Sequence, residues 1–242
     1  MLEAVPLALI LISAVLSYFL TLKSRLVGGL SALTLTGVSL VVNTYLLIAG
    51  GKLVVGGGAL VFNGAYFFIS ELILFLGFLT CLYSLGYLEG RVNLGLYLTL
   101  HQLLLGSMMG LASSFNVLVM DLFLETATVT SALLILFAES ENSVNATCRY
   151  LVLSMCGTLV ILAGILWQYT CTGCLTVFKL ESPCLPELKW IAILYLLGFG
   201  VKAGLAPIGL LWLPPAHSEA PTPISVSLSS LLVQIAAFNI IR

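Results

Sequence analysis

The chain carries ionisable residues inside long apolar segments, where a charge is costly and therefore informative. Asp121 and Glu125 lie four residues apart, a spacing that places both carboxyls on one face of an otherwise apolar helix. Lys202 lies in a second apolar segment, and Pro207 follows it five residues later. A carboxylate and an ammonium that can pair and separate at bilayer depth could hold and release a proton.

Proline lacks the backbone N–H that would bond the carbonyl four residues earlier, so Pro207 predicts a kink or break beside Lys202. Membrane proteins build ion sites at mid-depth from broken helices of this kind. If Glu125 and Lys202 lie within about 4 Å, they attract by roughly 4 kcal/mol at an effective dielectric near 20. We expect this pair to be the functional centre. Asp121 either faces a hydrated interior and a cation together with Glu125, or it lies near the headgroups and only Glu125 is deep. The structural alternatives are a carboxyl that only packs between helices and a lysine that extends to the interface.

Further polar residues could extend a path from this pair. His217 lies in the segment WLPPAHSEAPTP, which we expect to be a connector at the membrane surface. There a histidine could receive a proton, or it could bond nearby backbone as a turn residue. The last apolar segment carries Ser227, Ser230 and Gln234 at helical spacing, which predicts one polar stripe that could hold water.

Two other polar residues are weaker candidates. His101 lies in an apolar segment and is expected to be a buried hydrogen-bonding residue. Arg149 lies at the start of another apolar segment, and we expect it to anchor that segment at the edge of the membrane.

The composition indicates which elements position these residues. The chain has 242 residues, of which 60% are hydrophobic and only 8% charged, too few polar groups to cover a soluble surface. We therefore predict an all-α, multi-pass membrane helix bundle with a broken seventh helix. Eight segments have about the 20 residues that a membrane span needs, and they cover residues 4–22, 27–48, 69–88, 92–112, 115–138, 148–169, 188–210 and 223–241.

The segments form one transmembrane domain over residues 1–242. Residues 1–91 hold three helices, and the glycine-rich stretch GGKLVVGGGALVFNG between the second and third predicts a short hairpin outside the membrane. Residues 92–242 form a five-helix unit.

The charge and cysteine patterns exclude other classes of site. Nine scattered Lys and Arg residues cannot build a phosphate-binding face, so we expect no nucleic-acid partner. Cys171, Cys174 and Cys184 precede the seventh span. A disulfide or free thiols are favoured over a metal, because this loop offers no fourth ligand.

The segment GFGVKAGLAPIGLLWLPPAHSEAPTPISVSLSSLLVQIAAFNIIR, residues 198–242, resembles the seventh and eighth helices of a known family. The family comprises the antiporter-like membrane subunits of respiratory complex I, of Mrp-type cation/proton antiporters, and of archaeal membrane-bound hydrogenases and sulfur reductases. The stretch from Asn63 to Tyr83, with YSLGY, is similar to the family's third helix, and DLFLE is similar to its fifth.

This resemblance implies a unit that translocates protons or sodium ions in the cytoplasmic membrane. It implies that Glu125 pairs with Lys202 on the broken helix, and that His217 is the connector histidine. It also implies no bound cofactor and no catalytic redox site in this chain, because the redox chemistry belongs to other subunits of an oxidoreductase complex. The region 92–242 resembles one antiporter repeat.

The chain departs from the family pattern in several places. Gln234 stands where many members have a lysine that passes the proton onward, and Asn63 stands where an aspartate is expected. Leu124 replaces a tryptophan, and Pro215 replaces an acid. The resemblance covers the first half of the family chain, so we expect a separate membrane chain to supply the second, inverted repeat.

Two functions of different class remain open at this point. In the first, the chain contributes an ion half-channel to a multi-subunit membrane complex. In the second, it is a shortened structural subunit that joins membrane modules without its own pumping. An independent secondary transporter is less favoured, because half of an inverted-repeat fold rarely closes a site alone.

Overall fold

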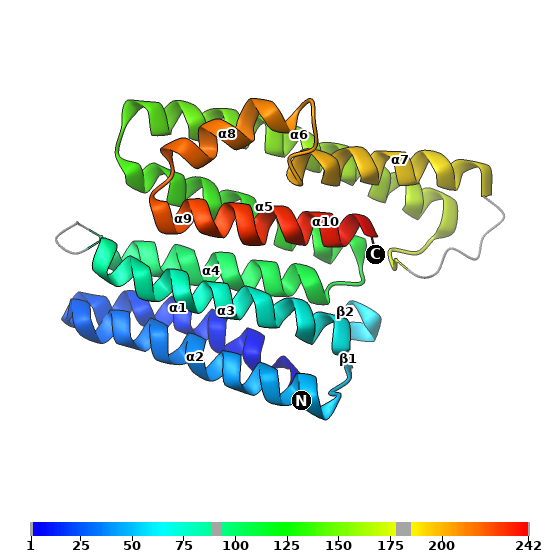
Figure 1. Ribbon diagram of the computed structural model, residues 1–242. Coiled ribbons are helices and arrows are strands. Elements are labelled where there is room, and N and C mark those ends of the chain that lie inside the picture. Colours follow the sequence, from blue (N-terminus) through cyan, green and yellow to red (C-terminus); the bar gives the residue numbers. More distant parts are fainter. Residues whose placement is uncertain (1, 89–92, 178–184, 242) are drawn as a thin grey trace.

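The computed structural model describes residues 2–88, 93–177 and 185–241, and it is an all-α membrane bundle (Figure 1). Seven helices in these ranges are long and apolar enough to cross a membrane. The helices of the N-terminal part are α1 (Val5–Lys23), α2 (Arg25–Ala49), α3 (Gly64–Tyr87) and α4 (Leu94–Ser113). Those of the C-terminal part are α5 (Val117–Ile135), α6 (Glu141–Thr172), α7 (Leu185–Lys202), α8 (Gly209–Glu219), α9 (Thr222–Ser227) and α10 (Val233–Ile241). Short 3₁₀ turns flank α1 and α5, at Leu2–Ala4 and Leu136–Ala138.

The helices lie side by side along one direction, with α4 at the centre (Figure 1). Helix α4 packs against α1, α3 and α5, and most of its residues are buried. Helix α7 packs on α6 and α10, while α8 packs on α6. This arrangement places the end of α7 beside α5, where Lys202 contacts Thr128.

The glycine-rich stretch between α2 and α3 forms a hairpin. Strands β1 (Leu53–Val55) and β2 (Leu60–Phe62) pair antiparallel. The turn between them needs glycine, because Gly57 has a φ of 65°, a left-handed conformation that other residues rarely adopt. The hairpin lies at the end of the bundle that also holds both chain ends in Figure 1.

Helix α6 begins earlier than the apolar pattern indicates. Its first residue is Glu141, whereas the predicted span starts at residue 148. The Ser140 side chain accepts a hydrogen bond from the Ser143 backbone N–H, and the Ser143 hydroxyl accepts one from the Ser140 backbone N–H. This capping box satisfies two donors at the helix start, so a polar segment can be helical here.

The predicted connector is also largely helical, which corrects that expectation. Most of WLPPAHSEAPTP belongs to α8, including Pro214 and Pro215, and only Ala220 and Pro221 separate α8 from α9. The helix is stabilised by packing rather than by propensity, because Trp212 and Ala216 are buried against the bundle. The predicted seventh span is divided between α7 and α8, which run end to end in Figure 1.

Helices α6 and α7 approach closely where two glycines face each other. A Cβ added to Gly198 would lie 2.7 Å from the carbonyl oxygen of Gly157 and 3.1 Å from the backbone nitrogen of Ile161. Because these neighbours are backbone atoms, the two helices would have to separate to admit a side chain. The close approach therefore sets the position of the α7 end.

We expect Gly198→Ala to lower the free energy of unfolding by about 1–3 kcal/mol, the usual cost of overpacking. Thermal unfolding of the purified protein in detergent measures this as a lower midpoint temperature. Gly86→Ala is the matched control, because a Cβ at Gly86 in α3 meets nothing within 4 Å. Equal midpoints for the two variants would contradict the close approach.

Candidate functional site

Lys202 is the last residue of α7, and its side chain is buried, with 1% of its surface exposed. Its Nζ donates a hydrogen bond of 2.6 Å to Oγ1 of Thr128 on α5. The Thr128 hydroxyl donates its own proton to the Leu124 carbonyl at 2.9 Å. A lone pair of Thr128 is thus directed at the lysine, and the ammonium has a defined acceptor.

The two acids lie on the same helix as this acceptor. Glu125 is half-buried and precedes Thr128 by three residues, so the two side chains lie one turn apart on α5. Asp121 is more buried than Glu125, and its Oδ1 has no hydrogen-bond partner. Among the described residues, no ion pair joins Lys202 to either acid, and Lys202 instead bonds Thr128. The expected contact between Glu125 and Lys202 is therefore not formed in this structure.

Pro207 lies in the non-helical segment between α7 and α8, where the Ala206–Pro207 peptide bond is cis. The Val201 carbonyl at this interruption accepts a 3.0 Å hydrogen bond from the Trp212 indole N–H. The Trp212 ring packs against Tyr150 of α6 with centroids 5.0 Å apart. Helix α8 thus supplies a donor to the end of α7, directly beside Lys202.

Three residues of this site were not predicted from the sequence. They are Thr128, Tyr150 and Trp212. Thr128 could have been found, because it follows Glu125 by one helical turn. Tyr150 and Trp212 could not, because their contacts depend on how α6 and α8 pack.

His217 lies near the end of α8, eight residues beyond Gly209 and thus about 12 Å along the helix. Its Nδ1 forms a 3.1 Å hydrogen bond with Oγ of Ser225 on α9. His217 is therefore a helical residue rather than a turn residue, and it contacts α9 rather than Lys202.

The three residues of the predicted polar stripe differ in exposure. Ser227 is fully buried, Ser230 is half-buried and Gln234 is exposed. A π-helical segment, Leu228–Leu232, lies between the first and the last. Its wider turn shifts the later residues around the helix, so the spacing of an α-helix no longer describes the stripe.

The two weaker candidates are in different surroundings. His101 is fully buried in α4, where its Nε2 lies 2.9 Å from Oγ1 of Thr80, and its Nδ1 has no hydrogen-bond partner. Arg149 is exposed on α6 and lines a polar cavity of about 210 Å³ together with Glu219. Neither lies at the Lys202 site.

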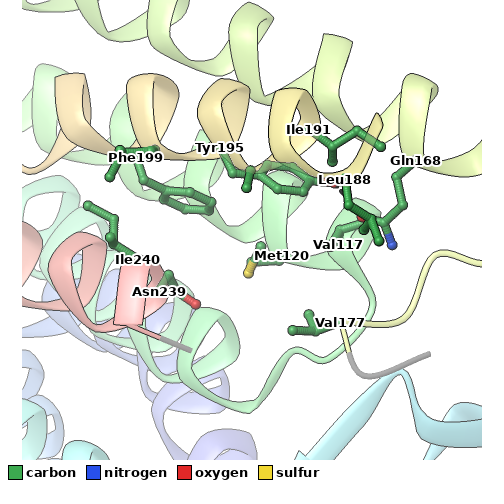
Figure 2. A pocket seen from close by; sticks show the side chains of 12 residues that line it. Val117, Met120, Gln168, Val177, Leu188, Ile191, Tyr195, Phe199, Asn239 and Ile240 are labelled. Atoms are coloured by element: carbon green, nitrogen blue, oxygen red, sulfur yellow. Dashed lines mark hydrogen bonds between the residues drawn. The ribbon is translucent and has the colours of Figure 1, made fainter. Parts of the chain in front are cut away.

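A larger cavity of about 400 Å³ lies between α5, α6, α7 and α10 (Figure 2). Phe199, three residues before Lys202, and Met120, the neighbour of Asp121, line it. The remaining wall is mostly apolar, with a hydrogen-bonded pair formed by Tyr195 and Gln168, whose atoms are 2.7 Å apart. The cavity thus extends to the level of the ionisable residues.

The cysteines before α7 carry no disulfide within the described part of the chain. Cys174 is a free thiol, and the Cys171 thiol donates a hydrogen bond to Glu187. Cys184 lies outside the described residues.

Residues 114–242, more than half of the chain, match a family model described as NADH:quinone oxidoreductase/Mrp antiporter, transmembrane. The hydrogenase-4 component F homolog of Methylacidiphilum infernorum is 29% identical over 205 residues, which cover 74% of this chain and 43% of the relative. A Na⁺/H⁺ antiporter subunit A1 of Staphylococcus aureus is 33% identical over 180 residues, covering 72% of this chain and 22% of the relative. The chain thus spans less than half of the length of these relatives.

Solved structures show the same fold. A chain of the membrane-bound sulfane sulfur reductase, an archaeal respiratory membrane complex, matches with a TM-score of 0.90 at 22% identity. That match covers 99% of this chain and 52% of the other. A chain of the Mrp complex from Dietzia sp. matches with a TM-score of 0.85 at 23% identity, covering 98% of this chain and 27% of the other. A chain of Thermus thermophilus respiratory complex I matches with a TM-score of 0.79 at 24% identity, covering 98% and 52%.

Proposed function

The chain belongs to the NADH:quinone oxidoreductase/Mrp antiporter family of multi-pass membrane proteins, and we propose that it contributes a proton or sodium half-channel to a multi-subunit complex. One observation carries this proposal. The Lys202 ammonium is buried in the bundle interior and bonds a neutral hydroxyl, although a carboxyl lies one turn away. A charge kept at such a place without a bonded counter-charge is costly and is characteristic of ion pathways.

Two positions for the ammonium explain how the site would act. Side chains one turn apart on a helix are separated by about 5–6 Å, so small rotations of the flexible lysine would move Nζ between Thr128 and Glu125. At Glu125 the ammonium gains a counter-charge. At Thr128 it has only a dipole, which favours release of its proton. The exchange between these positions is the proposed switch.

The large cavity supports access to this switch from the hairpin end of the bundle. Tyr195, Gln168 and Asn239 provide polar atoms on its otherwise apolar wall. A cavity of about 400 Å³ could hold roughly a dozen waters at about 30 Å³ each. Asp121, next to the cavity residue Met120, would be the first carboxyl that an ion meets.

At the opposite end, His217 and Ser225 would connect Lys202 to the aqueous phase. Ser227 at the end of α9 and Ser230 in the π-helical segment would add polar groups, and the exposed Gln234 would face a neighbouring chain. Pro207 would keep the α7–α8 interruption open beside the lysine. We place Arg149 at the membrane edge and His101 in the structural core, outside this path.

The proposed partners are other membrane subunits, because the solved relatives come from multi-subunit complexes. The proposal includes a second repeat, supplied by one of these subunits and equivalent to the part of the sulfur reductase chain outside the match. We place the complex in the cytoplasmic membrane, with residues 1–91 and 92–242 acting as one transmembrane domain.

A second function, a structural subunit without pumping, is favoured by one residue. Gln234 cannot titrate, so a proton path that continues along α10 would stop there. Ion translocation by membrane vesicles that contain the assembled complex separates the two functions. Lys202→Met abolishes translocation if the chain conducts ions and leaves it unchanged if the chain is structural.

We also expect Thr128→Val to slow translocation by roughly tenfold or more, because a hydrogen bond to a charged group contributes about 1.5–3 kcal/mol. Thr128→Ser should restore most of the rate, since it returns the hydroxyl. The measurement is ion uptake by vesicles containing equal amounts of assembled complex. Thr126→Val is the control on the same helix, because the Thr126 hydroxyl bonds only the Leu122 carbonyl among the described residues. Equal rates for the two valine variants would show that the Lys202–Thr128 contact has no role.

A further inference from the structure

Helix α3 carries a carboxyl that the proposed pathway does not use. Glu71 is half-buried, and each of its carboxylate oxygens accepts a hydrogen bond from α2. Nδ2 of Asn43 donates to Oε2 at 2.7 Å, and the Thr44 hydroxyl lies 2.7 Å from Oε1. The three side chains form one polar cluster between α2 and α3.

The cluster lies inside the membrane region but near one end of the bundle. Glu71 is seven residues from the start of α3 at Gly64, and Asn43 is six residues from the end of α2 at Ala49. Both therefore lie about 10 Å from the end that carries the hairpin. Among the described residues no cation pairs with Glu71. The two hydrogen-bond donors are neutral, so they bring no positive charge to the carboxylate.

The Asn43 side chain is also incompletely satisfied. Asn43 is fully buried, and its amide nitrogen donates both to Glu71 and to the Phe67 carbonyl, at 2.9 Å to the latter. The Phe67 carbonyl and the Glu71 carboxylate are both acceptors, so the amide group must turn its nitrogen, the donor, toward them. Its Oδ1 is then buried without a hydrogen-bond partner. A buried polar atom of this kind is costly unless another state of the site satisfies it.

We propose that Glu71, Asn43, Thr44 and the Phe67 carbonyl form a binding site for a dehydrated sodium ion. A half-turn of the Asn43 amide would exchange its nitrogen for Oδ1, which would then face the Glu71 carboxylate and the Phe67 carbonyl. After this half-turn the cation would take the place of the amide protons, between Oδ1 and the two acceptor oxygens. The ion would then meet carboxylate, amide, carbonyl and hydroxyl oxygens, the donors that hard cations prefer.

The charge of the site selects a monovalent ion. One carboxylate neutralises one positive charge, whereas a divalent ion would leave an excess charge in an apolar surrounding. The cluster shares no residue with the proposed Lys202 pathway, because it joins α2 to α3 while that pathway joins α5 to α7. This proposal therefore does not depend on ion translocation through Lys202.

Equilibrium binding of ²²Na⁺ to the purified complex containing the full chain, in potassium-free choline buffer, tests the site. We expect saturable binding that is lost in Glu71→Gln and retained in Glu125→Gln, which separates this site from the translocation pathway. We also expect Thr44→Val to weaken binding by severalfold, because it removes one ligand and keeps the volume. Thr34→Val is its control on the same helix, since Thr34 is exposed and bonds only the Ser31 carbonyl among the described residues.

Wild-type binding in Glu71→Gln would overturn the proposal, as would equal binding in Thr44→Val and wild type. If Glu71→Gln fails to assemble, the comparison of Thr44→Val with its control Thr34→Val still tests the proposal. Infrared difference spectra on adding NaCl provide an independent measurement. A shift of the ionised carboxylate band that disappears in Glu71→Gln supports the sodium site. A protonated carboxyl band that sodium does not change identifies a proton site instead and overturns it.

Discussion

Lys202→Met is expected to reduce ion translocation by the assembled complex to the background rate while the complex still forms. Methionine has nearly the length and volume of the lysine stem, and the buried site offers the ammonium a single hydrogen bond, to Thr128, among the described residues. Replacing an unpaired buried charge by an apolar side chain of similar volume is often neutral or stabilising for folding. The measurement is ion uptake by vesicles, normalised to the amount of complex.

Lys189→Met is the matched control for this prediction. Lys189 is on the same helix but is exposed, so its loss changes charge without changing the site. Thermal unfolding of both variants should give midpoints close to that of the wild type. If Lys202→Met translocates ions at the Lys189→Met rate in an intact complex, the chain is a structural subunit.

Glu125→Gln is expected to reduce translocation by roughly ten- to a hundredfold, because the ammonium loses the counter-charge of its second position. A charge-assisted hydrogen bond contributes about 1.5–3 kcal/mol, and each 1.36 kcal/mol corresponds to a factor of ten. Glu125→Asp keeps the charge but shortens the side chain, so it should be intermediate. Glu139→Gln is the control, because Glu139 is an exposed acid beyond the end of α5.

Equal translocation rates for Glu125→Gln and Glu139→Gln would exclude the proposed exchange of the ammonium between Thr128 and Glu125.

The sequence predicted most helices because length and hydrophobicity are local properties. It misplaced elements where a local signal was outweighed by specific contacts. The polar start of α6 is helical because Ser140 and Ser143 cap it. Pro214 and Pro215 are helical because Trp212 anchors α8 to the Val201 carbonyl and to Tyr150. The stripe of Ser227 and Gln234 changes face because the helix widens between them.

By itself the sequence determined that the chain is a multi-pass membrane protein, and it identified Lys202 and Glu125 as ionisable residues in apolar helices. Only the tertiary structure decided their partners. Lys202 bonds Thr128, 74 residues away in the chain, and Glu71 bonds Asn43, 28 residues away. The physical reason is that a helix period places residues on a face, whereas helix packing and rotation decide which face meets which. The packing and rotation of the helices are set by contacts between residues far apart in the chain, such as Gly157 and Gly198.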